Sequence, residues 1–265
     1  MISAVVTTFN SSEYLADCLK SLKKSKFIDE IVISDDGSSL NEISNLKKII
    51  NESGVSFKIK FYINETNRGA YKNKYDAVMH AKNEIVYLID SDNIAMYNID
   101  KIFNLIIKEK DKHSLYIPSK IFHFYNSVNI FSRLLNRLLG KIEVFSKRNI
   151  ELNKKDIQEI FQGEKIIHNK SKSIYWVLNI GNFIFYKSMF LKNTKNTDNF
   201  SREDLSLDAV ASTYYWLKNG NKIHLLKNFY HFHRKRYDSV SWSEQESTKL
   251  SRKKFNNLFL SINKN

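Results

Sequence analysis

Residues 2–25, ISAVVTTFNSSEYLADCLKSLKKS, contain an apolar run, a short polar loop and an amphipathic segment. The run is rich in β-branched residues that do not alternate with polar ones, which is typical of a strand buried on both faces. After Ser11 and Ser12, which offer an N-cap, apolar side chains recur at helical spacing: Leu15, Cys18, Leu19 and Leu22. The stretch therefore predicts a strand, a loop and a helix.

The same unit recurs along the first 90 residues. The further strands and helices are predicted at EIVISDD (30–36), LNEISNLKKIINES (40–53), FKIKFYIN (57–64), YKNKYDAVMHAKN (71–83) and EIVYLID (84–90). Strands that alternate with helices of about 10 to 15 residues indicate parallel βαβ units and a doubly wound sheet. Ligands bind such sheets outside the carboxyl ends of the strands. The polar clusters TTFN (7–10), DDGSS (35–39) and DSDN (90–93) are expected there.

Beyond residue 100 the predicted elements are of mixed type. We expect a helix at 98–110 and a strand pair or hairpin at 114–125. The ranges 173–180 and 181–190 are either two strands or a strand and the start of a helix. They are followed by a predicted helix at 205–220, a strand at 222–233 and a basic amphipathic helix at 247–265. Ser201 and Asp204 resemble a capping box before the 205–220 helix, with Asp in place of Glu.

The segment 129–149, NIFSRLLNRLLGKIEVFSKRN, places an apolar face opposite basic side chains. Around it, the range 130–155 holds seven basic and two acidic residues. A basic amphipathic helix of this kind can lie on an anionic membrane surface. It can also be a surface helix that packs on the sheet, and the sequence leaves both interpretations open.

The composition is that of one compact globular unit. The 265 residues are 42% apolar, and seven Gly and one Pro leave no low-complexity linker. The net charge of +14 favours anionic partners such as nucleic acid, anionic lipid or phosphorylated small molecules. A single cysteine, the start MISAVVTTFN without signal-peptide features and short apolar runs predict a cytosolic protein with at most peripheral membrane contact.

Two pairs of carboxylates follow strands that end at the same sheet edge. Asp90 and Asp92 can hold a hard divalent cation, which can neutralise a diphosphate in the same crevice. The pair Asp35 and Asp36 can accept hydrogen bonds from a nucleobase or a ribose. Both pairs also suit ordinary turns. The absence of G-x-G-x-x-G and G-x-x-x-x-G-K argues against nicotinamide and P-loop nucleotide sites.

Three stretches, in their order and spacing, resemble the nucleotide-sugar-binding half of family 2 glycosyltransferases with the GT-A fold. They are SAVVTTFNSSEYLADCLKSL (3–22), IVISDDGSS (31–39) and NRGAYKNKYDAVMHAKNEIVYLIDSDN (67–93). The resemblance implies an inverting enzyme of the bacterial surface-polysaccharide type. Its α/β fold would be a Rossmann-like, mostly parallel central sheet flanked by helices, with a mixed acceptor-side half. The chain would divide into a nucleotide-sugar-binding half (1–100), an acceptor-binding and catalytic half (101–240) and a basic tail (241–265).

The resemblance also implies donor-binding roles for matching positions. The residues expected to bind the nucleotide sugar are Thr7, Phe9, Asn10, Asp36, Arg68, Lys72, Lys74, Asp90, Ser91 and Arg234. Thr7 and Phe9 would border the uracil, and Asp36 would bind the base. Phe9 stands where many relatives carry Tyr, and KNK (72–74) replaces the usual ARN-like signature.

The implied cofactor is a divalent metal, Mn²⁺ or Mg²⁺. Asp92 would be its firmest ligand, and Asp90 would contact both the metal and the ribose. Period-two spacing puts His231 and His233 on one face of a strand. By the resemblance one of them would complete the metal shell: His231 fits best, three residues before Arg234, and His233 is the alternative ligand. The alternative is an exposed His pair without a metal role.

The stretch REDLSLDAV (202–210) is similar to the E-D motif of the family. By this resemblance Asp204 would accept the proton of the attacking hydroxyl, with Glu203 as its neighbour or substitute. Alternatively, both acids only favour a helix N-terminus through the helix dipole. Trp176, Asn182 and Trp242 are expected near the acceptor, although large aromatic residues more often belong to the core.

The expected function is metal-dependent transfer of a sugar from a UDP-sugar to a glycan or lipid-linked acceptor. The enzyme would contact the anionic inner face of the cell membrane peripherally, and no nucleic acid partner is expected. One alternative is a sugar-1-phosphate nucleotidyltransferase, which would need a Gly-rich phosphate loop that TTFNSSEY (7–14) lacks. The other is a basic nucleic-acid or membrane-surface binding module whose acidic motifs are only turns.

Overall fold

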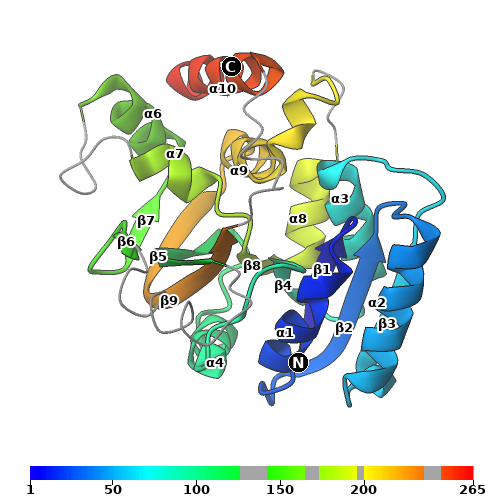
Figure 1. Ribbon diagram of the computed structural model, residues 1–265. Coiled ribbons are helices and arrows are strands. Elements are labelled where there is room, and N and C mark those ends of the chain that lie inside the picture. Colours follow the sequence, from blue (N-terminus) through cyan, green and yellow to red (C-terminus); the bar gives the residue numbers. More distant parts are fainter. Residues whose placement is uncertain (126–141, 165–172, 196–199, 236–245, 265) are drawn as a thin grey trace.

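Four parallel strands form the first half of one sheet, as the repeating pattern predicts. The computed structural model describes residues 1–125, 142–164, 173–195, 200–235 and 246–264. The strands, in the spatial order β3-β2-β1-β4, are β1 (Ile2–Thr8), β2 (Ile28–Asp35), β3 (Ile59–Ile63) and β4 (Ile85–Asp90). The connecting helices are α1 (Ser12–Leu22), α2 (Leu40–Glu52) and α3 (Ala70–His80), with a 3-10 turn at Ser56–Lys58. Figure 1 shows this half in blue and cyan.

The sheet continues beyond β4 into a mixed half. β8 (Phe183–Tyr186) pairs antiparallel with β4 and with β5 (Ser114–Tyr125), while β5 runs parallel to β9 (Lys222–Lys235). Two short strands complete it, β6 (Ile142–Val144) beside β5 and β7 (Ile150–Leu152) beside β9. The order along the sheet is β3-β2-β1-β4-β8-β5-β9-β7, and β6 pairs with β5 off this path. The predicted α/β fold, with a parallel first half and a mixed second half, is confirmed.

Six helices and a 3-10 turn at Asp204–Ser206 flank the mixed half in the described ranges. The helices are α4 (Ile99–Glu109), α6 (Lys154–Gln162), α7 (Ser173–Leu178), α8 (Lys187–Thr194), α9 (Asp208–Lys218) and α10 (Glu246–Leu260). None of the helices in the described part of the chain is long and apolar enough to cross a bilayer.

The C-terminal helix α10 lies beside α6 and α9, at the top of Figure 1. Its side chains Phe255 and Phe259 are fully buried, and Ile262 just beyond the helix is buried as well. Full burial of a large apolar side chain contributes about 1.5 to 3 kcal/mol of stability. The helix predicted from the basic tail therefore turns its apolar face into the protein.

The sheet separates two apolar cores. Successive residues of β1 alternate between them, because side chains of a strand point to opposite faces. Val6 packs with the α1 side chains Leu15 and Leu19 on one side, and Val5 packs with Val78 of α3 on the other. The apolar stripe predicted for α1 is thus the one that the structure buries.

Several predictions for the second half are wrong in detail. The strand proposed at 173–180 begins as α7, because Ile174, Val177 and Leu178 share one face of a helical turn and are all buried. The range 114–125 is one strand rather than a hairpin, since it pairs with β9 along its length and only shifts register near Pro118. Of the helix proposed at 129–149, residues 142–144 form β6, and positions 129–141 lie outside the described residues.

Candidate functional site

The three polar clusters meet at the carboxyl edge of the parallel strands, as predicted. In the sheet register Thr7 lies opposite Asp90, and Thr8 lies opposite Asp35. The Thr7 hydroxyl donates to Oδ1 of Asp90 over 3.2 Å. The Oγ atoms of Ser11 and Ser91 are 3.0 Å apart, which ties the loop after β1 to the DSDN loop.

Asp36 organises the approach to α3. Its Oδ1 accepts from the Arg68 amide over 2.8 Å and from Asn64 Nδ2 over 3.2 Å, while its Oδ2 accepts from the Gly69 amide over 2.9 Å. A carboxylate has about four acceptor positions, so these three bonds leave capacity for a further donor. The imide N–H of a uracil is a donor of that kind.

The loop after β1 offers an exposed ring near this carboxylate edge. Phe9 is 44% exposed, and the next residue, Asn10, has a φ of 45°, in the left-handed region that Asn tolerates. The Asn10 amide donates to Ser38 Oγ over 2.8 Å, and its side-chain oxygen accepts from the Ser39 amide over 3.2 Å. Asn10 therefore serves the loop geometry, and the Phe9 ring is available for stacking.

Lys74 is a buried cation between two carboxylates. Its Nζ lies 2.7 Å from Oδ1 of Asp90 and 2.7 Å from Oδ2 of Asp208. Burial disfavours its charge, but the two neighbouring carboxylates outweigh that effect and raise the pKa of Lys74. Burial also raises the pKa of Asp208, with a further contribution from Asp90 and an opposing one from Lys74. Lys74 thus carries a fixed positive charge beside the DSDN loop.

A second set of charges lies at the start of α3. Asp76 pairs with Arg68 Nη1 over 2.6 Å and also with the Lys72 ammonium, one helical turn earlier. Arg68 and Lys72 are both nearly half exposed. Asp76 therefore gathers two cations that can still turn towards an anionic ligand.

Arg234 lies behind the DSDN loop and is buried. Its Nε donates to the Asp92 carbonyl over 3.0 Å, and its Nη2 pairs with Asp17 over 2.8 Å. Its guanidinium also lies over the rings of Tyr14 and Phe124. In this arrangement Arg234 fixes the backbone that carries the Asp92 carboxylate.

Each of the two candidate metal-binding histidines contacts another polar side chain. The His231 ring nitrogen Nδ1 is 2.6 Å from Asn182 Nδ2, and His233 Nδ1 is 3.1 Å from His123 Nδ1. Burial, together with the neighbouring histidines, lowers the pKa of His231 well below its usual range and that of His233 to about 4. Both imidazoles are therefore neutral at pH 7, the form that can ligate a metal.

No group of three or more His, Cys, Asp or Glu side chains in the described ranges is arranged to hold a metal ion. Asp90 nevertheless ends β4, and Asp92 follows two residues later in the turn at the sheet edge. Mg²⁺ is commonly held by one or two carboxylates together with substrate phosphates and water. The donor set fits a cation that enters with a diphosphate, not one held by a complete protein cage.

Asp204 forms the predicted capping box with Ser201. The Ser201 amide donates to Asp204 Oδ2 over 3.1 Å, and the Asp204 amide donates to Ser201 Oγ over 3.2 Å. The box begins a 3-10 turn, and α9 starts only at Asp208. Burial raises the pKa of Asp204, but hydrogen bonds, first of all from Lys254, outweigh it and lower the pKa overall. The adjacent Glu203 is exposed.

The acceptor residues are described only in part. Asn182 is buried next to His231, and Trp176 lies on α7. Trp242 lies outside the described residues.

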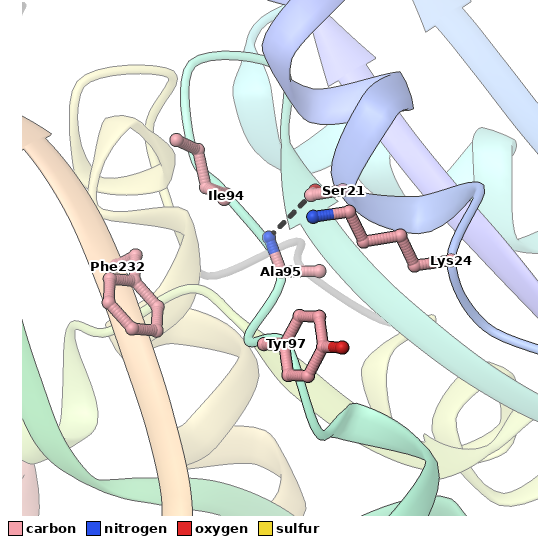
Figure 2. Close-up of a pocket in the computed structure, with 6 residues that line it drawn as sticks. All are labelled: Ser21, Lys24, Ile94, Ala95, Tyr97 and Phe232. Atoms are coloured by element: carbon pink, nitrogen blue, oxygen red, sulfur yellow. Dashed lines mark hydrogen bonds between the residues drawn. The ribbon is translucent and has the colours of Figure 1, made fainter.

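A small cavity of about 190 Å³ lies between α1 and the segment after the DSDN loop. Its lining consists of Ser21, Lys24, Ile94, Ala95, Tyr97 and Phe232. The Ser21 hydroxyl accepts a hydrogen bond from the Ala95 amide over 3.0 Å. The dashed line in Figure 2 marks this bond. None of the predicted site residues lines this cavity.

Three residues of the site have no role predicted from the sequence motifs. Asp208 lies four residues after Asp204 in the same stretch, Asp76 lies four residues after Lys72, and Lys254 lies in the tail. The i,i+4 spacing of Lys72 and Asp76 on one helix is a signal that the sequence does contain. The partners of Asp208 and Lys254 are distant in sequence, and only the fold brings them together.

Comparison with known proteins points to the same family as the three motifs. The family model described as Glycosyl transferase family 2 matches residues 3–174. Glycosyltransferase GlyG of Streptococcus pneumoniae serotype 4 is 28% identical over 112 residues, which are 42% of this chain and 36% of GlyG. The GalNAc(5)-diNAcBac-PP-undecaprenol beta-1,3-glucosyltransferase of Campylobacter jejuni is 31% identical over 94 residues, which are 35% of this chain and 29% of that protein. The chain thus spans about a third of each relative.

Solved structures share the fold. The crystal structure of S. aureus TarS 1-349 has a TM-score of 0.61 and 20% identity, and the match covers 98% of this chain and 69% of that one. TarS 1-349 in complex with UDP-GlcNAc has a TM-score of 0.62 and 19% identity, with coverages of 98% and 70%. At such identities the likeness shows the fold alone, and it confirms the predicted GT-A architecture.

Proposed function

Because the chain belongs to glycosyl transferase family 2, we propose that it transfers a sugar, with inversion, from a nucleotide-diphosphate donor to an acceptor hydroxyl. The observation that supports this most is the position of Asp36, Asp90 and Asp92 at one sheet edge. Asp90 lies opposite Thr7, the Asp36 amide donates to the Thr8 carbonyl, and the amide of Ser91, next to Asp92, donates to the Thr7 carbonyl. A site for a nucleotide sugar needs one polar group that binds the base, a second that binds the ribose, and a cation that neutralises the diphosphate. TarS structures with UDP and with UDP-GlcNAc share the fold, which supports a UDP-linked donor.

The nucleoside would lie across the loops after β1 and β2. Phe9 would stack on the uracil, since the ring is exposed, and Asp36 would accept a hydrogen bond from the imide N–H. Asp90, already oriented by Thr7 and Lys74, would contact the ribose. Buried, prearranged acceptors discriminate well against bases that lack the matching donor.

The diphosphate would lie between the DSDN loop and α3. Arg68 and Lys72 would donate charge-assisted hydrogen bonds to phosphate oxygens, and Lys74 would add a fixed charge beside them. A bound Mn²⁺ or Mg²⁺ would supply further positive charge to the departing diphosphate. Asp92 and Asp90 would hold that ion, and Arg234 would keep the Asp92 backbone in place.

In the reaction, the acceptor oxygen forms a bond to the anomeric carbon while the bond from that carbon to the diphosphate oxygen breaks. The bonding electrons leave with the diphosphate, and the hydroxyl proton passes to Asp204. Attack from the face opposite the leaving group inverts the anomeric configuration. A carboxylate base held in reach of the hydroxyl typically contributes about 10²- to 10⁴-fold in rate.

The acceptor is proposed to be a glycan or a lipid-linked saccharide in bacterial surface polysaccharide synthesis. The name of the Campylobacter relative includes a PP-undecaprenol-linked acceptor, which supports this class. The net charge of +14 suits peripheral contact with the anionic inner face of the cell membrane.

Titration of UDP with and without Mn²⁺ tests the donor site directly. We expect UDP binding that strengthens with Mn²⁺, and slow hydrolysis of one nucleotide sugar in a screen of UDP-, GDP- and dTDP-linked donors. The sugar released should have the inverted anomeric configuration, which NMR can read early in the reaction. Metal-independent UDP binding without hydrolysis of any donor would contradict the proposal.

A further inference from the structure

The C-terminal helix supplies two side chains to the proposed catalytic carboxylate. Lys254 of α10 pairs with Oδ2 of Asp204, and the Ser251 hydroxyl donates to Oδ1 over 2.9 Å. Ser251 is itself buried, at 3% exposure. Together with the Ser201 amide, α10 thus fixes both oxygens of Asp204.

The position of α10 is set by its own packing. The Phe255 ring stacks on Phe200 with a centroid distance of 5.0 Å, and Phe259 stacks on Phe161 of α6 at 5.1 Å. The Lys254 ammonium also lies over the Phe200 ring, 4.8 Å from its centroid. Lys254 and Ser251 are therefore presented to Asp204 by a docked helix and not by a free tail.

We infer that Lys254 and Ser251 are positioning residues for the acceptor-side chemistry, and that α10 is a structural part of the active site. This inference rests on the proposed function, in which Asp204 takes the proton of the acceptor hydroxyl. Two donors from α10 select one orientation of the carboxylate, and the Lys254 charge keeps it ionised. Neither residue needs to touch the substrate.

The charges around Asp204 support this assignment. Lys254 is a cation of α10 that pairs with Asp204, and Arg202 and Glu203 precede Asp204 in its own segment. The other packed elements, α3 and α9, carry Lys72, Asp76 and Asp208. Asp76 pairs with Lys72 and with Arg68, and Asp208 pairs with Lys74.

A merely structural ion pair is the rival explanation. Lys254 is 43% exposed, and exposed ion pairs contribute little to stability. If the pair only tethers the helix, its loss changes the melting temperature and leaves the pH dependence of the reaction unaltered. If it positions the base, its loss changes the pH dependence.

The test compares Lys254→Gln, Lys254→Arg and Ser251→Ala with Lys253→Gln, which removes an exposed charge from the neighbouring position of α10. The readout is the pH profile of kcat for nucleotide-sugar hydrolysis, with the donor KM and the melting temperature measured in parallel. In the wild type, Lys254 opposes the effect of burial and lowers the pKa of Asp204. Without Lys254 that pKa should rise, so the acid limb, the range in which kcat falls as Asp204 takes up a proton, should move to higher pH.

We expect kcat of Lys254→Gln to fall about tenfold on that limb, at unchanged donor KM, since misplaced catalytic groups cost rate rather than ground-state binding. Lys254→Arg should restore the limb, Ser251→Ala should lower kcat less, and Lys253→Gln should match the wild type. Coincident acid limbs in the wild type and in folded Lys254→Gln would overturn the assignment. A wild-type protein that hydrolyses no nucleotide sugar would instead overturn the proposed function, and the assignment with it.

Discussion

The ammonium group of Lys74 lies 2.7 Å from a carboxylate oxygen of Asp90, the first acid of the DSDN loop. It lies equally close to Asp208, at the start of α9. One buried side chain of α3 thus connects the loop that follows β4 with the segment that follows Asp204. The predicted donor-binding and catalytic parts of the chain share this ion pair.

Replacing Lys74 by Met should destabilise the protein in a pH-dependent way. Without the ammonium, Asp90 and Asp208 lose the cation that both contact, and we expect a loss of about 3 to 5 kcal/mol of unfolding free energy at neutral pH. The pKa of Asp208, already raised by burial, rises further when Lys74 is lost. The folded variant then binds a proton more readily than the unfolded chain, so the deficit should shrink as the pH falls. Urea denaturation across the acidic range measures this.

Lys72→Met is the matched control. Lys72 lies on the same helix and pairs with Asp76, but its side chain is 45% exposed. Its replacement should change the unfolding free energy by less than about 1 kcal/mol, because exposed pairs contribute little. Equal deficits in both variants, or a Lys74→Met deficit that grows in acid, would refute the account of the Lys74 cluster.

Asp92→Asn should weaken UDP binding in the presence of Mn²⁺ by about 100-fold and leave metal-free binding little changed. The amide keeps the size of the side chain but lacks the charge that a hard cation prefers. Calorimetric titration with and without Mn²⁺ gives both values. Glu52→Gln, at the exposed end of α2, removes the same charge elsewhere and should behave as the wild type. Undiminished metal-dependent binding by Asp92→Asn would remove Asp92 from the metal site.

Phe9→Ala should reduce UDP affinity about tenfold, since stacking of a base on an aromatic ring contributes roughly 1 to 3 kcal/mol. The ring is 44% exposed, so the melting temperature should hardly change. Phe9→Tyr keeps the stacking face and should bind UDP as the wild type does. An affinity that is the same in Phe9→Ala would show that the ring does not border the base.

The first half of the fold could be predicted from the sequence because its signals are local. The strand EIVYLID is one uninterrupted apolar run that the sheet buries. The helix that begins at Ser12 buries apolar side chains that recur at helical spacing. The carboxyl edge follows from the parallel topology, so the meeting of Thr7 with Asp90 could be anticipated. The mixed half could not be predicted equally well, since α7 and β8 are short apolar runs in which strand and helix periodicity are hard to distinguish.

The site was predictable where a motif sits on one loop, and not where distant segments meet. The DSDN loop could be placed from its strand alone. Lys254 reaches Asp204 across 50 residues of sequence. That contact depends on how α10 packs on Phe200, and no short pattern encodes it.

Gly181→Ala should weaken UDP binding by changing the surroundings of Asp90. Gly181 has a φ of +76°, and a Cβ added there would lie 3.4 Å from Asp90 Oδ2 and 3.7 Å from the Lys74 ammonium. Lys74 and Thr7 contact the other oxygen, Oδ1, so the added methyl group would crowd the oxygen that a ribose or cation would approach. We expect a several-fold loss of UDP affinity.

Gly220→Ala separates this effect from backbone strain, because Gly220 has a φ of +80° and nothing within 4 Å of its added Cβ. Both variants should lose about 1 kcal/mol of unfolding free energy to the left-handed backbone, but only Gly181→Ala should bind UDP more weakly. Equal UDP affinities in the two variants would show that the space beside Asp90 Oδ2 is not part of the donor site.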